Sequence, residues 1–282
     1  MTILVTGGQG QLGRHLGHHA GVVALGRDGL DICDPTSIQR ALHAHEPSCV
    51  IHCAAFTNVD GCTRDPVRAH RVNAGGTECV AAACAADGVP LLHVSTDYVI
   101  GGPDTPGHRL AVDAPIQALS TYARSKWAAE EAVRAHGGTI VRVQWVYSVD
   151  GSGFINRAIE KMRQGESVPL VTDQVGCPTP ARLLARWFLE LAEVQNPPSI
   201  VHLATTGTAT PAEWVGAFAR ALGVEPVWHP VSRAILTGAP RPARSCLDVT
   251  ETEALFGRAL PDWATALRSL MAAQPRPSEV GE

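Results

Sequence analysis

The sequence predicts an α/β protein with a Rossmann-like, doubly wound parallel sheet and a smaller C-terminal α/β substrate-binding region. Two observations carry this prediction. Short apolar runs alternate with amphipathic segments of about 10 to 20 residues through the first half, as expected where helices cover both faces of a parallel sheet. A glycine-rich turn at residues 7–13 directly follows the first apolar run, which is where such sheets carry a dinucleotide-binding turn.

The first half is expected to alternate five strands with four helices. Asp34-Pro35-Thr36 predicts a helix start, because proline fits the first turn of a helix. The continuous apolar run at 89–94 is typical of a central parallel strand, which is buried on both faces. The expected strands are 1–6, 22–25, 49–53, 90–95 and 139–146, and the expected helices are 10–19, one from 34 onward, 66–87 and 122–136.

The pattern loosens after about residue 147. We therefore expect a dinucleotide-binding domain at 1–147, joined by a returning segment near 199–222, and a mainly substrate-binding region at 148–282. Proline and glycine cluster between 223 and 243, which indicates irregular structure or a lid, and the polar end at 274–282 is expected to fray. The other expected elements are a loop at 148–153, helices at 154–165, 180–194, 211–222 and 264–273, and a strand at 199–203.

Composition excludes several classes of protein. Apolar residues make up 45% of the 282 positions and charged residues 18%, so the chain can bury a sizeable core. The net charge is −4 and the basic residues do not cluster, which argues against nucleic-acid binding. No apolar run reaches the roughly 18 residues of a membrane span, and the start leaves no room for a signal peptide. A cytoplasmic protein is expected.

The eight cysteines show neither a CxxC pair nor metal-ligand spacing with histidine. In the absence of an export signal, we interpret them as reduced thiols. No metal site is predicted.

The turn around Gly7, Gly10 and Gly13 fits the pattern GxxGxxG. Its glycines let backbone N–H groups approach a pyrophosphate, and the following helix start favours negative charge. Arg27 follows the second expected strand, where it can pair with a 2′-phosphate; this favours NADPH, although a solvated surface arginine fits as well and NADH stays possible. Asp31 and Ile32 can contact the adenosine, or Asp31 can cap a turn.

Tyr122 and Lys126 form a YxxxK pair on an expected helix. Positions i and i+4 share one helix face, so the phenol and the ammonium can contact the same ligand. A ketone that accepts hydride needs a proton donor for its oxygen. An ammonium nearby is expected to lower the pKa of the phenol and to hold the nicotinamide ribose.

The segment His93 to Val99 ends an expected parallel strand. Ligands bind at the carboxyl ends of such strands. The hydroxyl of Thr96 or of Ser95 is therefore expected to donate a hydrogen bond to the same carbonyl oxygen, unless both merely cap the strand.

Together these residues resemble the dTDP-4-dehydrorhamnose reductase family of extended short-chain dehydrogenases/reductases, over nearly the whole chain. Each block stands in the family's order. The similar blocks are CAAFTNVD at 53–60, VNA at 72–74, STDYV at 95–99, RVQWVY at 142–147, DQVGCPT at 173–179, RPARS at 241–245 and LPDW at 260–263.

The resemblance implies roles for individual residues. Thr96, Tyr122 and Lys126 would be the catalytic set. The cofactor would be held by Gly7, Gly10, Gln11, Leu12, Arg27, Asp31, Ile32, Ala54, Ala55, Asn73, Ser95, Tyr122 and Lys126. The sugar would be bordered by Val59, Thr96, Asp97, Tyr98 and Trp145.

The chain also departs from the family pattern. Ala123, Ile100, Gln144 and Cys246 replace a glycine, a phenylalanine, a small hydroxyl residue and a basic residue, and these changes can alter which sugar is accepted. Some members bridge subunits with Mg²⁺ through glutamates, but the matching places here hold His15 and Arg182.

The expected function is hydride transfer from NAD(P)H to the C4 ketone of a dTDP-4-keto-6-deoxysugar, above all dTDP-4-dehydro-L-rhamnose. A ketoreductase for another sugar and a nucleotide-sugar epimerase stay open. A 4,6-dehydratase would need Asp-Glu after the threonine, where this chain has Asp97-Tyr98. A regulatory subunit without catalysis is disfavoured by the intact triad. The expected partner is the nucleotide sugar, and the expected assembly is a monomer or homodimer.

Overall fold

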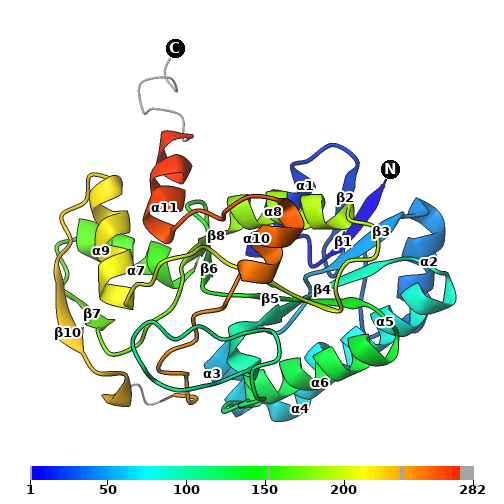
Figure 1. Cartoon of the computed structure of the whole chain (residues 1–282), viewed down its shortest axis with the longest axis horizontal. Helices are drawn as coiled ribbons and strands as arrows, with labels where there is room; N and C mark the ends of the chain where they lie inside the picture. Colours follow the sequence, from blue (N-terminus) through cyan, green and yellow to red (C-terminus); the bar gives the residue numbers. More distant parts are fainter. Residues whose placement is uncertain (1, 152, 236–237, 274–282) are drawn as a thin grey trace.

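The computed structural model describes residues 2–151, 153–235 and 238–273. Its centre is a parallel six-stranded sheet with strand order β2-β1-β3-β4-β5-β9 (Figure 1). This order, with helices on both faces, confirms the predicted Rossmann-like fold class. The strands are β1 (Ile3–Thr6), β2 (Val22–Leu25), β3 (Cys49–His52), β4 (Leu91–Thr96), β5 (Thr139–Val143) and β9 (Ile200–Leu203).

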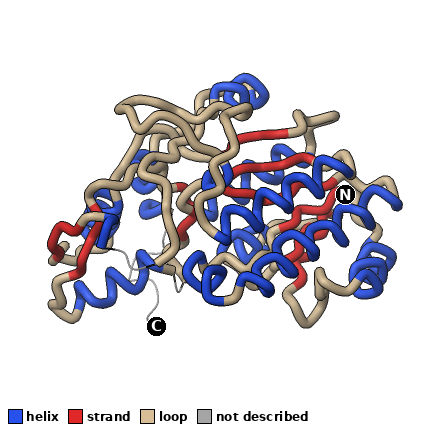
Figure 2. The backbone as a smooth tube through the Cα atoms, turned by 90° about the horizontal axis from the view of Figure 1, so that it is seen from below, coloured by secondary structure: helices blue, strands red, loops and turns tan. Residues whose placement is uncertain are grey.

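Helices cover both faces of the sheet (Figure 2), and an apolar layer lies between the helices and the sheet on each face. On one face, Leu16 of α1 and Phe188 of α8 pack against sheet residues such as Ile51. On the other face, Ile38 of α2 and Val133 of α6 belong to a second layer. The helices around the sheet are α1 (Gln11–Gly17), α2 (Pro35–His45), α3 (Val59–Arg64), α4 (Pro66–His70), α5 (Gly76–Ala86), α6 (Thr121–Ala135), α8 (Ala181–Ala192) and α10 (Thr250–Phe256).

Local signals explain several helix boundaries. Asp34 caps α2, since its side chain accepts a hydrogen bond from the backbone N–H of Thr36 at 2.9 Å. Ser120 caps α6 in the same way through the N–H of Ala123. The helix expected at 66–87 is α4 followed without a break by a π-helical turn at 71–75 and by α5.

A third apolar cluster lies beyond the carboxyl ends of the strands. It joins side chains such as Ile155, Leu170, Phe218 and Leu267. The helices here are α7 (Phe154–Arg163), α9 (Pro211–Ala221) and α11 (Trp263–Ala272). Two short parallel pairs accompany them, β6 (Val146–Tyr147) with β8 (Thr179–Pro180) and β7 (Val168–Val171) with β10 (Trp228–Val231).

Several sequence expectations need correction. The strand expected at 139–146 ends at Val143 and resumes as β6, because Trp145 has a positive φ of 39°. Strand β7 and helices α3 and α10 were not expected, and β10 falls inside the stretch expected to be irregular. Pro169 and Pro230 lie inside β7 and β10, and proline argues against a strand. The expectation for residues 274–282 lies outside the described residues.

Within the described parts of the chain, no helix combines the length and apolar content needed to cross a bilayer.

Candidate active site

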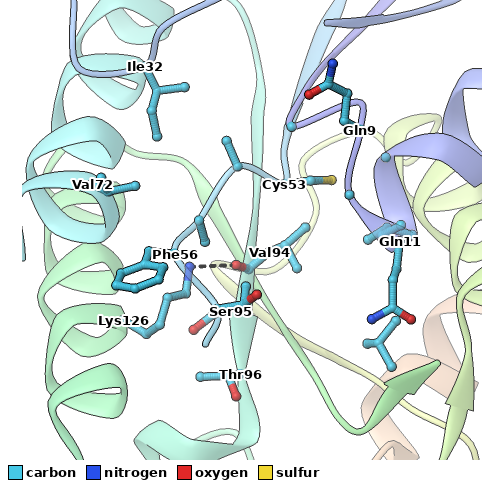
Figure 3. A pocket seen from close by; sticks show the side chains of 18 of the residues that line it. Gln9, Gln11, Ile32, Cys53, Phe56, Val72, Val94, Ser95, Thr96 and Lys126 are labelled. Carbon is cyan, nitrogen blue, oxygen red and sulfur yellow. Dashed lines mark hydrogen bonds between the residues drawn. The ribbon is translucent and has the colours of Figure 1, made fainter. Parts of the chain in front are cut away.

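One cavity of about 830 Å³ runs along the carboxyl ends of the central strands, from the glycine turn to Trp145 (Figure 3). It contains all but one of the residues that the sequence assigned to a site. Predicted residues in its lining are Gly7, Gly10, Gln11, Leu12, Arg27, Asp31, Ile32, Ala54, Ala55, Val59, Ser95, Thr96, Asp97, Tyr98, Tyr122, Lys126 and Trp145.

The glycine turn forms one end of the cavity. Gly7 adopts a φ of +71°, and a Cβ there would lie 2.8 Å from the backbone nitrogen of Ala54. A Cβ at Gly13 would overlap the carbonyl oxygen of Gly7. Gly10 is the N-cap residue of α1, where no side chain caps the helix, and it lines the cavity. The turn therefore brings bare backbone to the cavity wall.

Arg27 and Asp31 lie near the end of β2. Arg27 is exposed and lines the cavity, in keeping with either interpretation of its guanidinium. Asp31 caps a turn, since its Oδ1 accepts a hydrogen bond from the N–H of Cys33 at 2.9 Å. Sequence reasoning missed Arg68 and Arg71, which also line the cavity from α4 and the π-helical turn. Arg68 stacks 4.6 Å over the ring of Phe56.

Thr96 and Tyr122 meet where β4 ends beside the start of α6. The Thr96 hydroxyl donates to Asp97 Oδ1 at 3.1 Å and accepts from the N–H of Tyr98 at 3.2 Å. Burial raises the pKa of the Tyr122 phenol above its usual value, the Asp97 charge raises it further, and a hydrogen bond with Thr96 lowers it in part. The phenol is therefore protonated at neutral pH, as a proton donor must be.

Lys126 is 1% exposed and lies against β4. Its ammonium donates to the carbonyl oxygen of Val94 at 2.8 Å, as the dashed line in Figure 3 marks, and lies 2.9 Å from His93 Nε2. Burial lowers the pKa of Lys126 to about 8, although Glu130 and Cys53 raise it.

The sequence-based expectation that Lys126 lowers the pKa of Tyr122 needs correction. The pKa of Tyr122 is raised, because the phenol is buried and Asp97 lies nearby. The ammonium meanwhile hydrogen-bonds to the strand. One helix face does carry both side chains, but i, i+4 spacing alone did not reveal that β4 provides acceptors for the ammonium.

Asp97 is a buried carboxyl group held by neutral donors. Gln144 Nε2 donates to its Oδ2 at 3.2 Å and also to the carbonyl oxygen of Ser245 at 2.5 Å. Burial raises the pKa of Asp97 to about 6, while hydrogen bonds from Ser245, Thr96 and Gln144 lower it in part. The sequence marked Gln144 only as a departure from the family pattern.

Asn73, expected to hold the cofactor, does not line the cavity. It is fully buried, and its Oδ1 accepts from the N–H of Phe56 at 2.6 Å. Its Nδ2 donates to the carbonyl oxygen of Phe56 at 3.1 Å and to Ser125 Oγ at 2.9 Å. Asn73 therefore fastens the loop after β3 to α6.

Ser95 lines the cavity, but its hydroxyl is not free to meet a carbonyl there. It donates to Glu130 Oε1 at 2.5 Å within the layer between β4 and α6. Arg142 completes this buried group, with Nε and Nη2 donating to the two oxygens of Glu130 at 2.9 and 2.8 Å. Of the two candidate hydroxyls, Thr96 is the one beside the phenol.

Trp145 directly precedes β6 and lines the cavity. A Cβ at Gly176 would overlap the Trp145 ring, so only glycine fits against the indole there. The Trp145 ring lies 5.9 Å from that of Trp214. Tyr98 stands edge-on to Tyr122 with ring centres 6.1 Å apart. Among the described residues, no three His, Cys, Asp or Glu side chains gather as a metal site would require.

Known proteins match this chain over nearly its full length. A reductase from Streptomyces griseus, dTDP-4-dehydrorhamnose reductase, is 36% identical and is aligned over 94% of this chain and 91% of its own. A Streptomyces antibioticus protein named as a probable dTDP-4,6-dihydroxy-2-methyloxan-3-one 4-ketoreductase is 33% identical over 100% and 99%.

The fold also matches solved structures. The crystal structure of dTDP-4-dehydrorhamnose reductase from Bacillus anthracis in complex with NADP superposes with a TM-score of 0.90 at 27% identity, covering 97% of this chain and 100% of that one. The family model described as the RmlD substrate binding domain matches residues 1–275. The chain therefore belongs to the RmlD family, the family of the dTDP-4-dehydrorhamnose reductases.

Proposed function

We propose that this protein is a reductase that transfers hydride from NADPH to the C4 ketone of a dTDP-4-keto-6-deoxysugar. The first candidate substrate is dTDP-4-dehydro-L-rhamnose, with dTDP-L-rhamnose as product. The observation that carries the proposal is the meeting of Thr96, Tyr122 and Lys126 in the cavity that the glycine turn also lines. Two relatives named dTDP-4-dehydrorhamnose reductase align with 94% and 96% of the chain.

The residues of the cavity fit NADPH. Bare backbone at Gly7 and Gly10 suits a pyrophosphate, and Arg27 suits a 2′-phosphate at the adenosine end. Lys126 suits the nicotinamide ribose. When bound, the nicotinamide supplies the hydride.

The chain's own residues supply the proton and the orientation. Tyr122 carries its proton at neutral pH and gives it to the oxygen that accumulates negative charge. Thr96 donates a hydrogen bond toward the same oxygen in place of its bond to Asp97. Trp145 and Tyr98 enclose the sugar. Each of these groups is fixed by buried neighbours, which keeps the geometry ready before the ketone arrives.

A second candidate is the same reaction on a different deoxysugar. Gln144 favours it, because a long amide holds Asp97 where a small hydroxyl residue is usual in the family. The relative from Streptomyces antibioticus is named as a ketoreductase for a different sugar. The two candidates share cofactor and proton donor and differ only in the pocket around the sugar.

The test is NADPH oxidation with a panel of dTDP-4-keto-6-deoxyhexoses, with identification of the alcohol formed. We expect one molecule of NADPH consumed for each C4 alcohol. Tyr122→Phe removes the proton donor and is expected to lower kcat by about 10²-fold or more. Turnover by this variant close to wild type would contradict the role of Tyr122. Interconversion of sugars without net oxidation of the cofactor would instead indicate an epimerase.

The cytoplasm is the proposed location, and a monomer or homodimer the proposed assembly. The eight cysteines are free thiols, which suits a reducing compartment. Light scattering in solution distinguishes the two assemblies.

A further inference from the structure

Two histidines lie side by side beneath the candidate active site. His52 of β3 and His93 of β4 are paired in register, and their rings are 5.2 Å apart. Both side chains are fully buried. Burial lowers the pKa of His52 to about 3 and that of His93 well below its usual value, and the Lys126 charge lowers both further. Both rings are therefore neutral at pH 7.

The two rings differ in their partners. His52 is bonded on both nitrogens, to Thr6 Oγ1 at 2.6 Å and to Thr77 Oγ1 at 3.0 Å. His93 is bonded on Nε2 only, to Lys126 Nζ at 2.9 Å. Its Nδ1 is buried and has no hydrogen-bond partner among the described residues.

This arrangement fixes the tautomer of His93. The ammonium of Lys126 is a donor with no acceptor site, so Nε2 must accept and Nδ1 must carry the proton. A buried N–H without a partner destabilises a fold. An apolar side chain would avoid that cost, so the structural benefit of an imidazole here is its Nε2.

We propose that His93 is a positioning residue for the reaction, whose Nε2 holds the Lys126 ammonium at the wall of the cofactor cavity. Val94 provides the second acceptor, and together they take two of the three N–H donors. The third is left for a ligand in the cavity that Lys126 lines. This inference rests on the proposed function, because that function gives the ammonium its ligand.

The charged and titratable groups around the ammonium come from three elements. They are Glu130 on α6, Cys53 and His52 at β3, and His93 on β4. Of these, Glu130 is occupied by Arg142 and Ser95. Loss of the His93 acceptor therefore leaves the ammonium with the Val94 carbonyl alone.

The experiment compares His93→Leu with His93→Gln, since the end of a glutamine side chain reaches the position of Nε2 and can accept there. The first readout is the titration of Lys126, followed by NMR after labelling the lysine side chains. The chain has two lysines, so the exposed Lys161 is an internal reference. The second readout is the alkaline limb of kcat/KM for NADPH.

We expect His93→Leu to shift both the titration of Lys126 and the alkaline limb down by about one pH unit, the effect of losing a hydrogen bond to a charge. kcat/KM at pH 8 should fall about fivefold, because the protonated fraction of Lys126 drops from about one half to about one tenth. His93→Gln should keep both within about twofold of wild type. His52→Leu is the matched control: it removes an equally buried imidazole and should leave the titration of Lys126 in place.

An unchanged titration in His93→Leu would overturn the proposal, and so would an equal shift in His93→Gln. If His93→Leu does not fold, His93→Asn replaces it, because its shorter amide reaches only the position of Nδ1. The lysine titration needs neither sugar nor turnover. Failure of the proposed function would show as inactivity of the wild type on every sugar, whatever the titration gives.

Discussion

Lys126 and Glu130 lie one turn apart on α6, and both are buried, with 1% and 0% of the residue exposed. Their surroundings differ. Glu130 has a full set of partners, a bidentate guanidinium from Arg142 and the hydroxyl of Ser95. Lys126 has only neutral partners, the Val94 carbonyl and His93. The compensated charge connects α6 to β4 and β5, whereas the uncompensated one borders the cavity.

The contrast indicates which buried charge is structural and which serves a ligand. Removing one member of a buried, fully hydrogen-bonded ion pair destabilises the fold, because the other charge is left without its partner. A buried charge without a counter-ion has a shifted pKa and marks a functional site more often than a structural one. The pKa of about 8 at Lys126 and of about 6 at Asp97 both follow from burial and both belong to groups in the cavity lining.

Replacing Lys126 should affect activity far more than stability. We expect Lys126→Met to lower kcat/KM for NADPH by about 10³-fold, because both the ribose contact and the charge are lost. The midpoint of urea unfolding should stay or rise, since an uncompensated buried charge is removed. Lys161→Met, at an exposed lysine, should leave both values unchanged. A large drop in stability for Lys126→Met would break the contrast.

Replacing Glu130 should have the opposite outcome. Glu130→Ala leaves the Arg142 guanidinium buried without its carboxylate and should lower the free energy of unfolding by about 3–5 kcal/mol. The control is its neighbour Glu131, an exposed residue paired with exposed Arg134, where alanine should cost under about 1 kcal/mol. Equal losses from the two variants in urea titrations would show that the buried pair is not structural.

The smallest expected effect is that of Asp97 on stability, and it sharpens the same comparison. Its carboxyl pKa lies at about 6 in the folded protein against 3.8 ordinarily, so the folded state binds the proton more tightly. Its burial therefore lowers stability as pH rises from about 4 to 6, and the penalty persists above that range. Asp97→Asn should stabilise the protein by about 1–3 kcal/mol at pH 7 and by nothing at pH 3.5. Measurements of unfolding at both values test this, and a gain that does not depend on pH would contradict it.

Sequence reasoning predicted the features that depend on short stretches of the chain. The glycine turn, the capped helix at Asp34 and the i, i+4 pair on α6 depend on residues close in the chain, and each was in its expected element. The partners of Lys126 and Glu130 depend on the register between β4, β5 and α6. That register follows from packing over long sequence separations, so no local pattern contains it.

Two further differences have physical reasons. Asn73 was expected to hold the cofactor, but its amide is used up by Phe56 and Ser125, and only tertiary contacts reveal this. The strands β7 and β10 each contain a proline, which hid them from a pattern-based prediction. Their pairing is supported by the third apolar cluster, which includes Val168 and Leu170.

The most direct test of the central claim is the titration of Lys126 in the wild-type protein, with and without NADPH. A buried ammonium on neutral partners predicts a pKa of about 8 in the free protein. NADPH should raise it, as the cofactor occupies the remaining N–H, while the resonance of Lys161 stays in place. A Lys126 resonance that titrates near the ordinary lysine value of 10.5, or that does not respond to NADPH, would contradict the account.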